Sequence, residues 1–488
     1  MGIVQKQGFL ITLISYTGIV IGALNTMYIF PRVLGADKHG LVMLLLSISS
    51  LFTQFVHLGV PNVIIRFYPY FANKKKFIQR IAFQIPLISL SLFALFIFLM
   101  NDTIFHAYSI KSTLFASHTD FVFPLVTSLV LFEVLVSISR SELNTVIPSL
   151  LREFVLRVLT LLLLGLLFFN YINFKDFMLL WLGIYVINVA FMFLYLIIKG
   201  LSEFNFGWSL IDDKLLGKEM VNYGLITLLT TSASVLVHRI DVLMLGYYLN
   251  LENIAFYTIA LFMATLIQIP ARSILQIVKP LISMAWQQDD LNEIRYLYHK
   301  TALNQMIIGS LVFIGIWLNI DDLLLIVPEK YQGVQYVYFF IGFANLFDVS
   351  CGINGVILVT SKKYRYDLFV NMFLIGLTLL TNVIFIPIYG IEGAALATAI
   401  SVVIYNLMKW YLLKKLFGFQ PFNHKFLYAV AICLFTLFIT TQLSFDFDML
   451  FVRILLKSIF IFTIFCGLVL SFRISPDINT LFYRLIKK

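Results

Sequence analysis

Residues 177–198 read FMLLWLGIYVINVAFMFLYLII, a run of 22 residues without a charged side chain. A helix of this length rises about 33 Å, enough to cross the hydrocarbon core of a bilayer. Similar runs recur along the 488-residue chain, which is 60% hydrophobic, 16% aromatic and only 12% charged. Soluble domains carry roughly 25% charged residues. The sequence therefore predicts an all-α integral membrane protein and leaves no room for a large soluble catalytic domain.

Apolar runs bounded by charged residues predict about 14 transmembrane helices. Their positions are 8–30, 41–66, 81–101, 119–140, 153–170, 177–199, 221–248, 252–276, 301–320, 332–360, 368–388, 391–413, 426–444 and 454–472. The connections between these runs are short on both sides of the membrane. Short outer loops are unfavourable for an enzyme that must hold two glycan substrates outside the membrane.

The distribution of basic residues predicts the orientation of these helices. With the N-terminus in the cytoplasm, 26 of the 35 Lys and Arg residues fall on the inner side and 7 on the outer side, and Arg239 and Arg272 fall within spans. Cytoplasmic loops accumulate Lys and Arg, so both termini are predicted to be cytoplasmic. This asymmetry explains the net charge of +10 without a nucleic-acid partner.

An internal repeat predicts two halves. Leu-Phe-Glu-Val at 131–134 recurs as Leu-Phe-Asp-Val at 346–349, an offset of 215 residues, and the same offset relates Gly40 to Ala255. We therefore expect two pseudo-symmetric six-helix bundles of the same orientation, with a substrate cavity between them as in many transporters. The predicted parts are an N-terminal bundle over 1–200, a cytoplasmic linker over 201–220, a C-terminal bundle over 221–418, and two additional helices with a cytoplasmic tail over 419–488.

Short motifs then point to a family. The chain carries GADKHG at 35–40 with RFYP at 66–69, RID at 239–241 with LGYY at 245–248, and NVIFIP at 382–387 followed by YGIEGAA at 389–395. Together these segments resemble the polysaccharide flippases (Wzx-like, O-antigen and exopolysaccharide), a MATE-like branch of the multidrug/oligosaccharidyl-lipid/polysaccharide exporter superfamily. The resemblance covers about residues 1–418, and the last two spans fit the fourteen-span members.

The resemblance implies a transport function rather than an enzymatic one. The expected activity is translocation of undecaprenyl-diphosphate-linked oligosaccharide from the inner to the outer leaflet of the bacterial cytoplasmic membrane. It implies alternating access, no cofactor, and coupling to Na⁺ or H⁺. The expected partners are the lipid-linked oligosaccharide, membrane lipids and other polysaccharide-assembly membrane proteins.

Carrying a diphosphate through hydrocarbon requires a polar, cationic cavity, because unsolvated charges are costly there. Arg272 can grip a phosphate bidentately, or it snorkels to the inner headgroups or pairs with a carboxylate. Asn25, His57 and Asn345 complete the expected substrate-binding set, although a lone histidine on an apolar helix, such as His57, is more often a hydrogen-bonded core residue than a proton carrier or a phosphate contact. The lipid II flippase branch has cavity arginines on spans one, two and eight. Only Arg272 matches, which argues against lipid II itself as the substrate.

Two carboxylates in spans are exchanged by the repeat, namely Glu133 and Asp348. They can bind a coupling cation, hydrogen-bond sugar hydroxyls or neutralise Arg272 and Arg239, or each can pair locally and lock helices together. Arg239 and Asp241 lie two residues apart, so they face different neighbours on a helix. For these two we expect structural pairing or gating more than substrate contact.

Three arginines gather around the inner ends of spans four and five, where a diphosphate headgroup would arrive: Arg140, Arg152 and Arg157. An ordinary positive-inside loop explains them equally well. The sequence contains no P-loop, metal-ligand spacing or nucleophile elbow, so we expect neither a metal site nor enzymatic activity. The alternatives are a multidrug cation antiporter of the same superfamily and, against the short outer loops, a membrane glycan polymerase or ligase.

Overall fold

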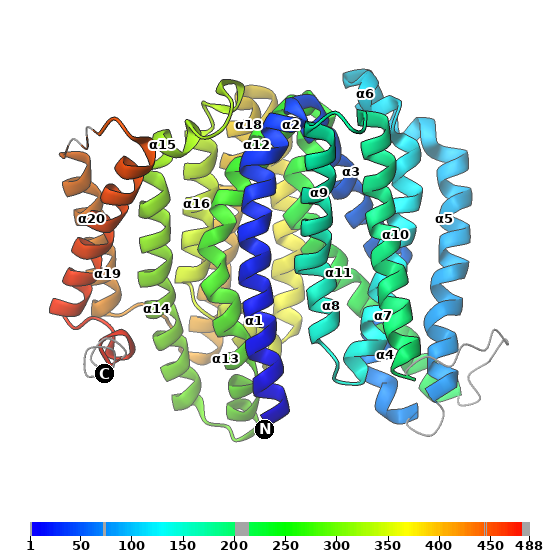
Figure 1. The fold of residues 1–488 in the computed structure, drawn as a ribbon. Helices are drawn as coiled ribbons and strands as arrows, with labels where there is room; N and C mark the ends of the chain where they lie inside the picture. Colours follow the sequence, from blue (N-terminus) through cyan, green and yellow to red (C-terminus); the bar gives the residue numbers. More distant parts are fainter. Residues whose placement is uncertain (1, 72–74, 201–213, 444, 446, 481–488) are drawn as a thin grey trace. The chain divides into compact units, whose positions relative to one another are not determined.

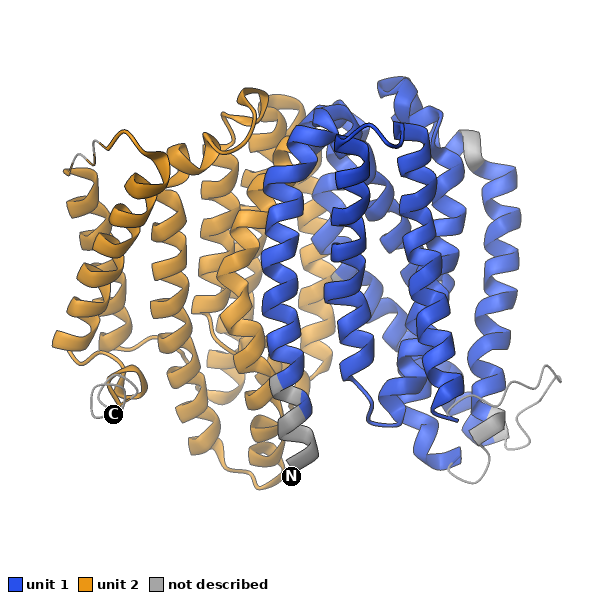
Figure 2. Ribbon diagram, viewed as in Figure 1, with its two compact units in different colours: residues 1–255 blue, residues 256–488 orange. Residues whose placement is uncertain are grey.

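The computed structural model describes residues 2–71, 75–200, 214–443, 445 and 447–480, and over these residues it contains helices and no strand (Figure 1). The predicted all-α class is confirmed. Contacts divide the chain into two compact units, unit 1 over Met1–Ala255 and unit 2 over Phe256–Lys488 (Figure 2).

Unit 1 contains long helices interrupted by short irregular turns. Its elements are α1 (Gly2–Ala23), the π-helical turn η1 (Leu24–Ile29), α2 (Phe30–Val33), α3 (Gly35–Val56), α4 (Val60–Phe67), the 3₁₀ turn η2 (Tyr68–Phe71), α5 (Lys75–Lys111), α6 (Thr113–Ala116), the 3₁₀ turn η3 (Thr119–Phe121), α7 (Val122–Ser141), α8 (Val146–Leu150), the π-helical turn η4 (Leu151–Val155), α9 (Leu156–Phe168), α10 (Phe174–Ile198) and α11 (Lys214–Tyr248). Its core lies where α7 packs against α3, α4 and α10, and α11 packs on α3 and α4.

Unit 2 begins within α12 (Leu251–Thr265). It continues with the 3₁₀ turn η5 (Leu266–Gln268), α13 (Ile269–Gln287), α14 (Leu291–Trp317), α15 (Ile320–Leu324), the 3₁₀ turn η6 (Glu329–Tyr331), α16 (Gln335–Ser350), α17 (Asn354–Thr360), α18 (Arg365–Phe417), α19 (His424–Thr441) and α20 (Leu450–Ser471). Within this unit α16 packs between α14 and α18, and α19 and α20 pack on α14.

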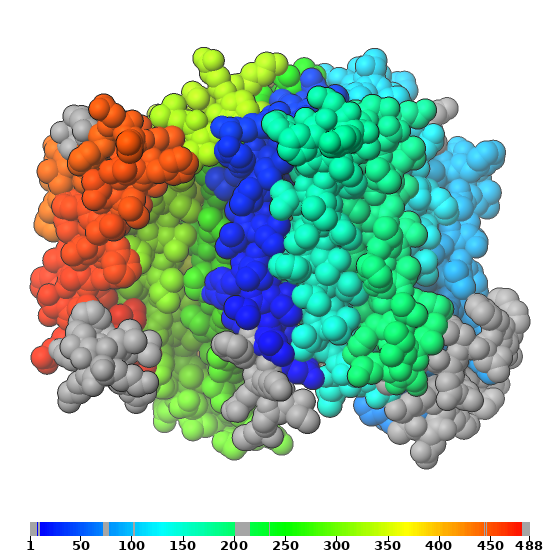
Figure 3. All heavy atoms as spheres, in the orientation of Figure 1, coloured from blue at the N-terminus to red at the C-terminus, as the bar shows by residue number. Residues whose placement is uncertain are grey.

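Glycine residues allow helices in unit 1 to approach closely. Gly18 and Gly22 lie one turn apart on α1, and a Cβ atom on either would collide with Glu153 or Arg157. This small-xxx-small spacing is typical of close helix contacts in membranes. Figure 3 shows the side chains of α1, in dark blue, lying against those of α9. The sequence therefore brings the charged η4–α9 segment directly onto the first helix.

The helix α18 is a hairpin of two spans. Its 53 residues would extend about 80 Å if straight, far more than a bilayer. Gly390 interrupts it with φ 60° and ψ −131°, a conformation open to glycine but not to other residues. Beyond this break, Gly393 lies so close to the carbonyl of Phe385 that a Cβ atom would collide with it. The predicted turn between 388 and 391 is thus formed at Gly390, and Gly393 allows the two arms to approach closely next to it.

The number of spans is only partly established. Among the described residues, ten helices are long and apolar enough to cross a membrane, and twelve if each of two bent helix pairs is one span. One of the ten is the hairpin α18, and the continuous segment from α8 through η4 to α9 is broken into pieces too short to qualify. The predicted count of fourteen stays a prediction.

Helix starts repeat along the chain at close to the offset found in the sequence. The starts of α3 and α12 are 216 positions apart, and those of α7 and α16 are 213 apart. Contacts nevertheless group α11 with unit 1, although the sequence assigns it to the second bundle. Residues 201–213 of the predicted linker lie outside the described residues.

A buried ion pair ties the two arms of α18 together. Lys409 Nζ lies 2.9 Å from Asp367 Oδ1, and the two side chains are only 5% and 13% exposed. Removing one member leaves the other as an uncompensated buried charge. We predict that Asp367→Asn lowers the free energy of unfolding by about 3 kcal/mol, whereas Asp367→Asn combined with Lys409→Met recovers most of this loss.

The measurement is unfolding of the purified protein from mild detergent into denaturing detergent. Asp477→Asn is the matched control, because Asp477 pairs with Lys300 at 3.0 Å but both side chains are more than one-third exposed, and such pairs contribute about 0–1 kcal/mol. Equal losses for Asp367→Asn and Asp477→Asn would contradict the assignment.

Candidate functional site

A polar stripe runs along α13 in unit 2. Arg272, Gln276, Lys279 and Ser283 are all exposed and recur at intervals of four, three and four residues, which places them on one face of a helix. The helix belongs to an apolar stretch, Leu251–Gln287, long enough to cross a membrane. An exposed polar face on such a helix cannot rest in lipid without cost and is expected to line a water-filled path.

Arg272, at the start of this stripe, has no carboxylate at ion-pair distance within the described residues. Its Nη2 atom donates weakly to Gln268 Oε1 at 3.4 Å. Gln268 Nε2 in turn donates to Asn345 Oδ1 at 2.8 Å, and Asn345 Nδ2 donates to the Ala264 carbonyl at 2.9 Å. The side-chain amides of Gln268 and Asn345 therefore hold each other in place. Most N–H donors of the Arg272 guanidinium stay available for another acceptor.

The sequence prediction placed Arg272 and Asn345 in one substrate-binding set, and the structure joins them through Gln268. The sequence analysis missed Gln268 and Gln276, which lie inside the predicted span 252–276, and missed Lys279 and Ser283 as part of the same face because they lie beyond its end. Continuing the helical spacing from Arg272 through Pro280 would have placed Gln276, Lys279 and Ser283 on the same face.

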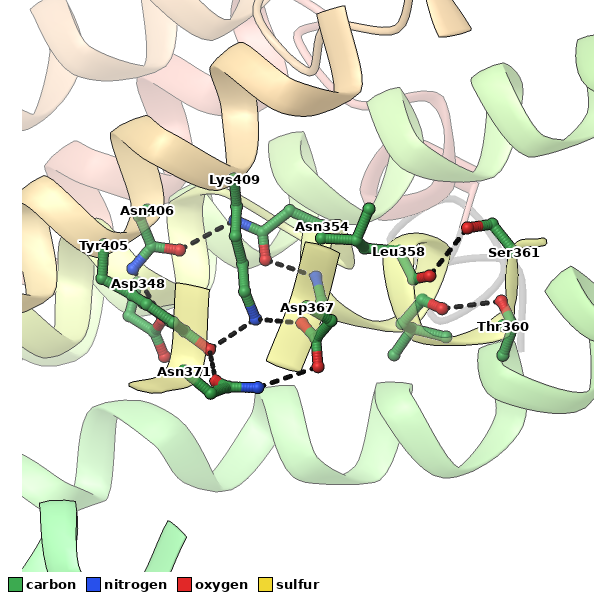
Figure 4. A network of polar contacts seen from close by, with 12 residues as sticks. Asp348, Asn354, Leu358, Thr360, Ser361, Asp367, Asn371, Tyr405, Asn406 and Lys409 are labelled. Carbon is green, nitrogen blue, oxygen red and sulfur yellow. Dashed lines mark hydrogen bonds and ion pairs between the residues drawn. The ribbon is translucent and has the colours of Figure 1, made fainter. Parts of the chain in front are cut away.

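Asp348 lies at the end of a chain of amide hydrogen bonds (Figure 4). The Gly355 N–H donates to Asn354 Oδ1 at 2.6 Å, Asn354 Nδ2 to Asn406 Oδ1 at 2.8 Å, and Asn406 Nδ2 to Asp348 Oδ1 at 2.8 Å. Every donor points towards the carboxylate, and such aligned dipoles reinforce one another in a low-dielectric interior. The chain of amides thus ends with one N–H donor held against the Asp348 carboxylate.

A second polar group adjoins this chain. Figure 4 shows Lys409 directed towards Asp367 and Tyr405, with Asn371 closing the ring. The Tyr405 hydroxyl donates to Asn371 Oδ1 at 2.8 Å, and Asn371 Nδ2 donates to Asp367 Oδ2 at 2.9 Å. The sequence analysis counted Lys409 among the inner-side charges, and it did not predict that the structure buries this side chain. The available signal was the four-residue spacing of Asp367 with Asn371 and of Tyr405 with Lys409.

Glu133, the repeat counterpart of Asp348, is held in a different environment in unit 1. Its Oε1 atom lies 2.6 Å from Arg152 Nη2, with both side chains about one-third exposed. Arg140 lies two turns further along α7, is exposed, and has no ion pair within the described part of the chain. This geometry corresponds to the alternative in which Glu133 pairs locally and holds two helices together.

The third inner-end arginine is also paired. Arg157 Nη2 lies 2.9 Å from Glu153 Oε2, and the Arg157 carbonyl accepts a hydrogen bond from Asn25 Nδ2 at 2.9 Å. Asn25 is buried in the π-helical turn η1. The structure thus joins Asn25 to Arg157, a contact that the sequence analysis did not predict.

His57 occupies the break between α3 and α4. Its Nδ1 atom accepts from the Gly59 N–H at 3.1 Å, and its Nε2 atom lies 3.2 Å from Gln54 Oε1. Both ring nitrogens are satisfied when the ring is neutral and carries its proton on Nε2. Leu58 and Gly59 both have positive φ, 51° and 71°, so the ring stabilises a tight turn. This geometry matches the alternative of a hydrogen-bonded core histidine.

Arg239 and Asp241 both lie in α11. Arg239 is partly buried near the phenol of Tyr185 in α10, and Asp241 is buried with 7% of its surface exposed. Among the described residues, no group of three or more His, Cys, Asp or Glu side chains is placed to hold a metal ion.

The fold is similar to that of solved membrane transporters. A structure of lipid II flippase MurJ in an inward closed conformation matches with a TM-score of 0.74 at 16% identity, covering 98% of this chain and 100% of that chain. An inward-facing multidrug resistance MATE family transporter of the MOP superfamily matches with a TM-score of 0.59 at 13% identity, covering 90% and 96%. The Vibrio cholerae MATE transporter VcmN in the bent form gives 0.52 at 15% identity, covering 84% and 96%. At these identities the likeness concerns the fold alone.

Sequence comparisons reach part of the chain. The "Uncharacterized membrane protein MJ1068" of Methanocaldococcus jannaschii is 21% identical over 330 residues, which is 64% of this chain, and the chain spans 61% of that relative's length. A family model described as "Polysaccharide biosynthesis protein" matches residues 5–286, more than half of the sequence. The chain is therefore a multi-pass membrane protein that belongs to the polysaccharide biosynthesis protein family.

Proposed function

We propose that this protein translocates an undecaprenyl-diphosphate-linked oligosaccharide from the inner to the outer leaflet of the bacterial cytoplasmic membrane, by alternating access. The observation that carries the proposal is the exposed polar stripe of α13, headed by Arg272 with no carboxylate partner in the described residues. The family match and the MurJ-like and MATE-like fold support a lipid-linked flippase.

The chemistry of the stripe suits an anionic, hydroxyl-rich cargo. A guanidinium presents two parallel donors that match two phosphate oxygens. Gln276 and Ser283 offer neutral donors and acceptors of the kind that sugar hydroxyls require, and Lys279 adds a second positive charge. A cationic drug would be repelled by Arg272 and Lys279, so this face favours a glycan carrier over the multidrug antiporter alternative.

The inner-end arginines of unit 1 have a supporting role in this proposal. Arg152 and Arg157 are each neutralised by a glutamate, so neither is a free phosphate site at rest. Arg140 remains as the exposed cation of the group. We assign Arg140 to the first electrostatic attraction of the diphosphate headgroup, the Glu133–Arg152 pair to the link between α7 and η4, and the Glu153–Arg157 pair to the junction of η4 and α9.

For energy coupling we propose a cation site at Asp348. Its carboxylate is polarised by the donor chain from Asn406 and Asn354 and is only partly buried, so Na⁺ or H⁺ can reach it. Glu133 already has Arg152 as a counter-ion. The two repeat-related carboxylates therefore have different roles, with the coupling ion on Asp348.

Arg272 gives the direct test of the substrate contact. We predict that Arg272→Ala lowers export of the surface glycan by at least about tenfold, because a charge-assisted phosphate contact is lost. Arg272→Lys should retain part of the activity, since it keeps the charge but not the bidentate geometry. The measurement is surface glycan in cells that depend on this protein, normalised to the amount inserted in the membrane.

The matched control is Arg295→Ala, which removes an exposed arginine from the neighbouring helix α14. It should leave glycan export unchanged. Unchanged export in Arg272→Ala, at normal membrane levels, would contradict the assigned role.

Asp348 gives a prediction about coupling. We expect transport by the reconstituted wild-type protein to respond to an imposed Na⁺ or H⁺ gradient, and Asp348→Asn to abolish that response. Asparagine keeps the hydrogen-bond acceptor for Asn406 but removes the negative charge, so the fold is retained. Glu133→Gln is the comparison, and its transport should keep the gradient dependence. A gradient response that survives in Asp348→Asn would exclude Asp348 as the coupling site.

A further inference from the structure

A groove of about 650 Å³ opens on unit 2 between the two arms of the α18 hairpin. It is lined by Arg365, Tyr366, Phe369, Met408, Tyr411 and Leu412. This volume lies in the range of sites for small organic ligands, roughly 300–1,000 Å³. None of the six residues belongs to the α13 stripe or to the amide chain that ends at Asp348.

The side chains along α18 explain where the groove lies. Near the Gly390 break the arms touch, because Gly393 meets the Phe385 carbonyl and Thr381 Oγ1 lies 3.1 Å from Ser401 Oγ. At the other end the arms carry large side chains. The buried pair of Asp367 and Lys409 fixes them there, since its members directly adjoin Tyr366 and Met408 in the sequence. The groove is thus a built feature of the hairpin.

The lining has one cationic end and an apolar body. Arg365 is the first residue of α18 and is exposed, while Phe369, Met408 and Leu412 supply apolar surface. Tyr366 and Tyr411 are amphipathic side chains of the kind that gather at the membrane interface. A cationic end next to an apolar groove suits an amphipathic ligand that has an anionic headgroup and an apolar tail.

The surroundings of the groove are strongly basic. Lys362, Lys363, Lys414 and Lys415 are exposed at the same ends of the arms. Neither they nor Arg365 form an ion pair with any described carboxylate, and the nearest acidic neighbour in sequence, Asp367, is already engaged by Lys409. Five positive charges therefore lie at the surface without a counter-ion among the carboxylates that the structure describes.

We propose that this groove binds an anionic phospholipid. The phosphate contacts Arg365 and the flanking lysines, and one acyl chain lies along Phe369, Met408 and Leu412. Basic pockets between transmembrane helices on the cytoplasmic side are suited to such headgroups, and the topology predicted from the sequence places this end of α18 on that side. A zwitterionic phospholipid would fit the apolar part but leave the positive charges uncompensated.

The test uses the purified full-length chain in non-ionic detergent, titrated with phosphatidylglycerol or with phosphatidylethanolamine of the same acyl chains. Retained lipid is counted by native mass spectrometry. We expect the wild-type chain to bind phosphatidylglycerol about tenfold more tightly than phosphatidylethanolamine, because the basic residues attract the anionic headgroup; tenfold corresponds to about 1.4 kcal/mol. Arg365→Gln should remove most of this preference, and Met408→Trp should weaken binding of both lipids by filling the groove.

Two matched controls keep the result specific. Lys425→Gln removes an exposed basic residue of α19 in the same unit, and Leu407→Trp adds the same bulk at an exposed position outside the groove. Both should bind phosphatidylglycerol like the wild-type chain.

Equal binding of the two lipids by the wild-type chain would overturn the proposal, as would a preference that persists in both groove variants. Stoichiometric displacement of phosphatidylglycerol by undecaprenyl phosphate would also overturn it, because the groove would then be a carrier-lipid site. Because the groove is separate from Arg272, these outcomes leave the transport proposal to its own test.

Discussion

Polar groups in a membrane-spanning chain must be satisfied within the protein or by water, because hydrocarbon offers no hydrogen bonds. Unit 2 shows both solutions. Asp367, Lys409, Tyr405 and Asn371 satisfy one another in a closed ring. The face of α13 that begins at Arg272 has no comparable ring among the described residues. Arg272 donates to Gln268 at 3.4 Å and Ser283 to the Lys279 carbonyl at 3.1 Å, so this face is the part of the unit that requires water or a polar ligand.

Close helix packing allows polar side chains to satisfy one another within the protein. Side-chain hydrogen bonds between helices need backbones that approach closely, and glycine provides that approach at Gly18 and Gly22 on α1 and at Gly393 on α18. These close contacts also position charged side chains. The first brings Arg157 onto the first helix, and the second closes the hairpin whose other end carries Lys409. The exposed surface of the chain is otherwise rich in Phe, Leu and Ile, as lipid contact requires.

Much of the fold follows from sequence patterns that act locally. Apolar length predicts spans, and the turn at Gly390 could be read from YGIEGAA, so the all-helical membrane class was predictable. Partners were less predictable, because they depend on distant contacts. The sequence identified Glu133 and Asp348 as a related pair, yet their neighbours are Arg152, 19 positions away, and Asn406, 58 positions away. No local pattern distinguishes these environments. Lys409 was counted with the inner-side charges by the positive-inside rule, which carries no information on burial. Its burial depends on the position of Asp367 on the adjacent arm.

The central claim is that the chain moves a lipid-linked glycan between leaflets. The most direct measurement reconstitutes the purified protein in liposomes with a fluorescent undecaprenyl-diphosphate oligosaccharide and adds a membrane-impermeant quencher outside. The account predicts that fluorescence protected in the inner leaflet becomes accessible over time in proteoliposomes but stays protected in protein-free liposomes. Equal protection in the two preparations, with the protein folded and inserted, would contradict it.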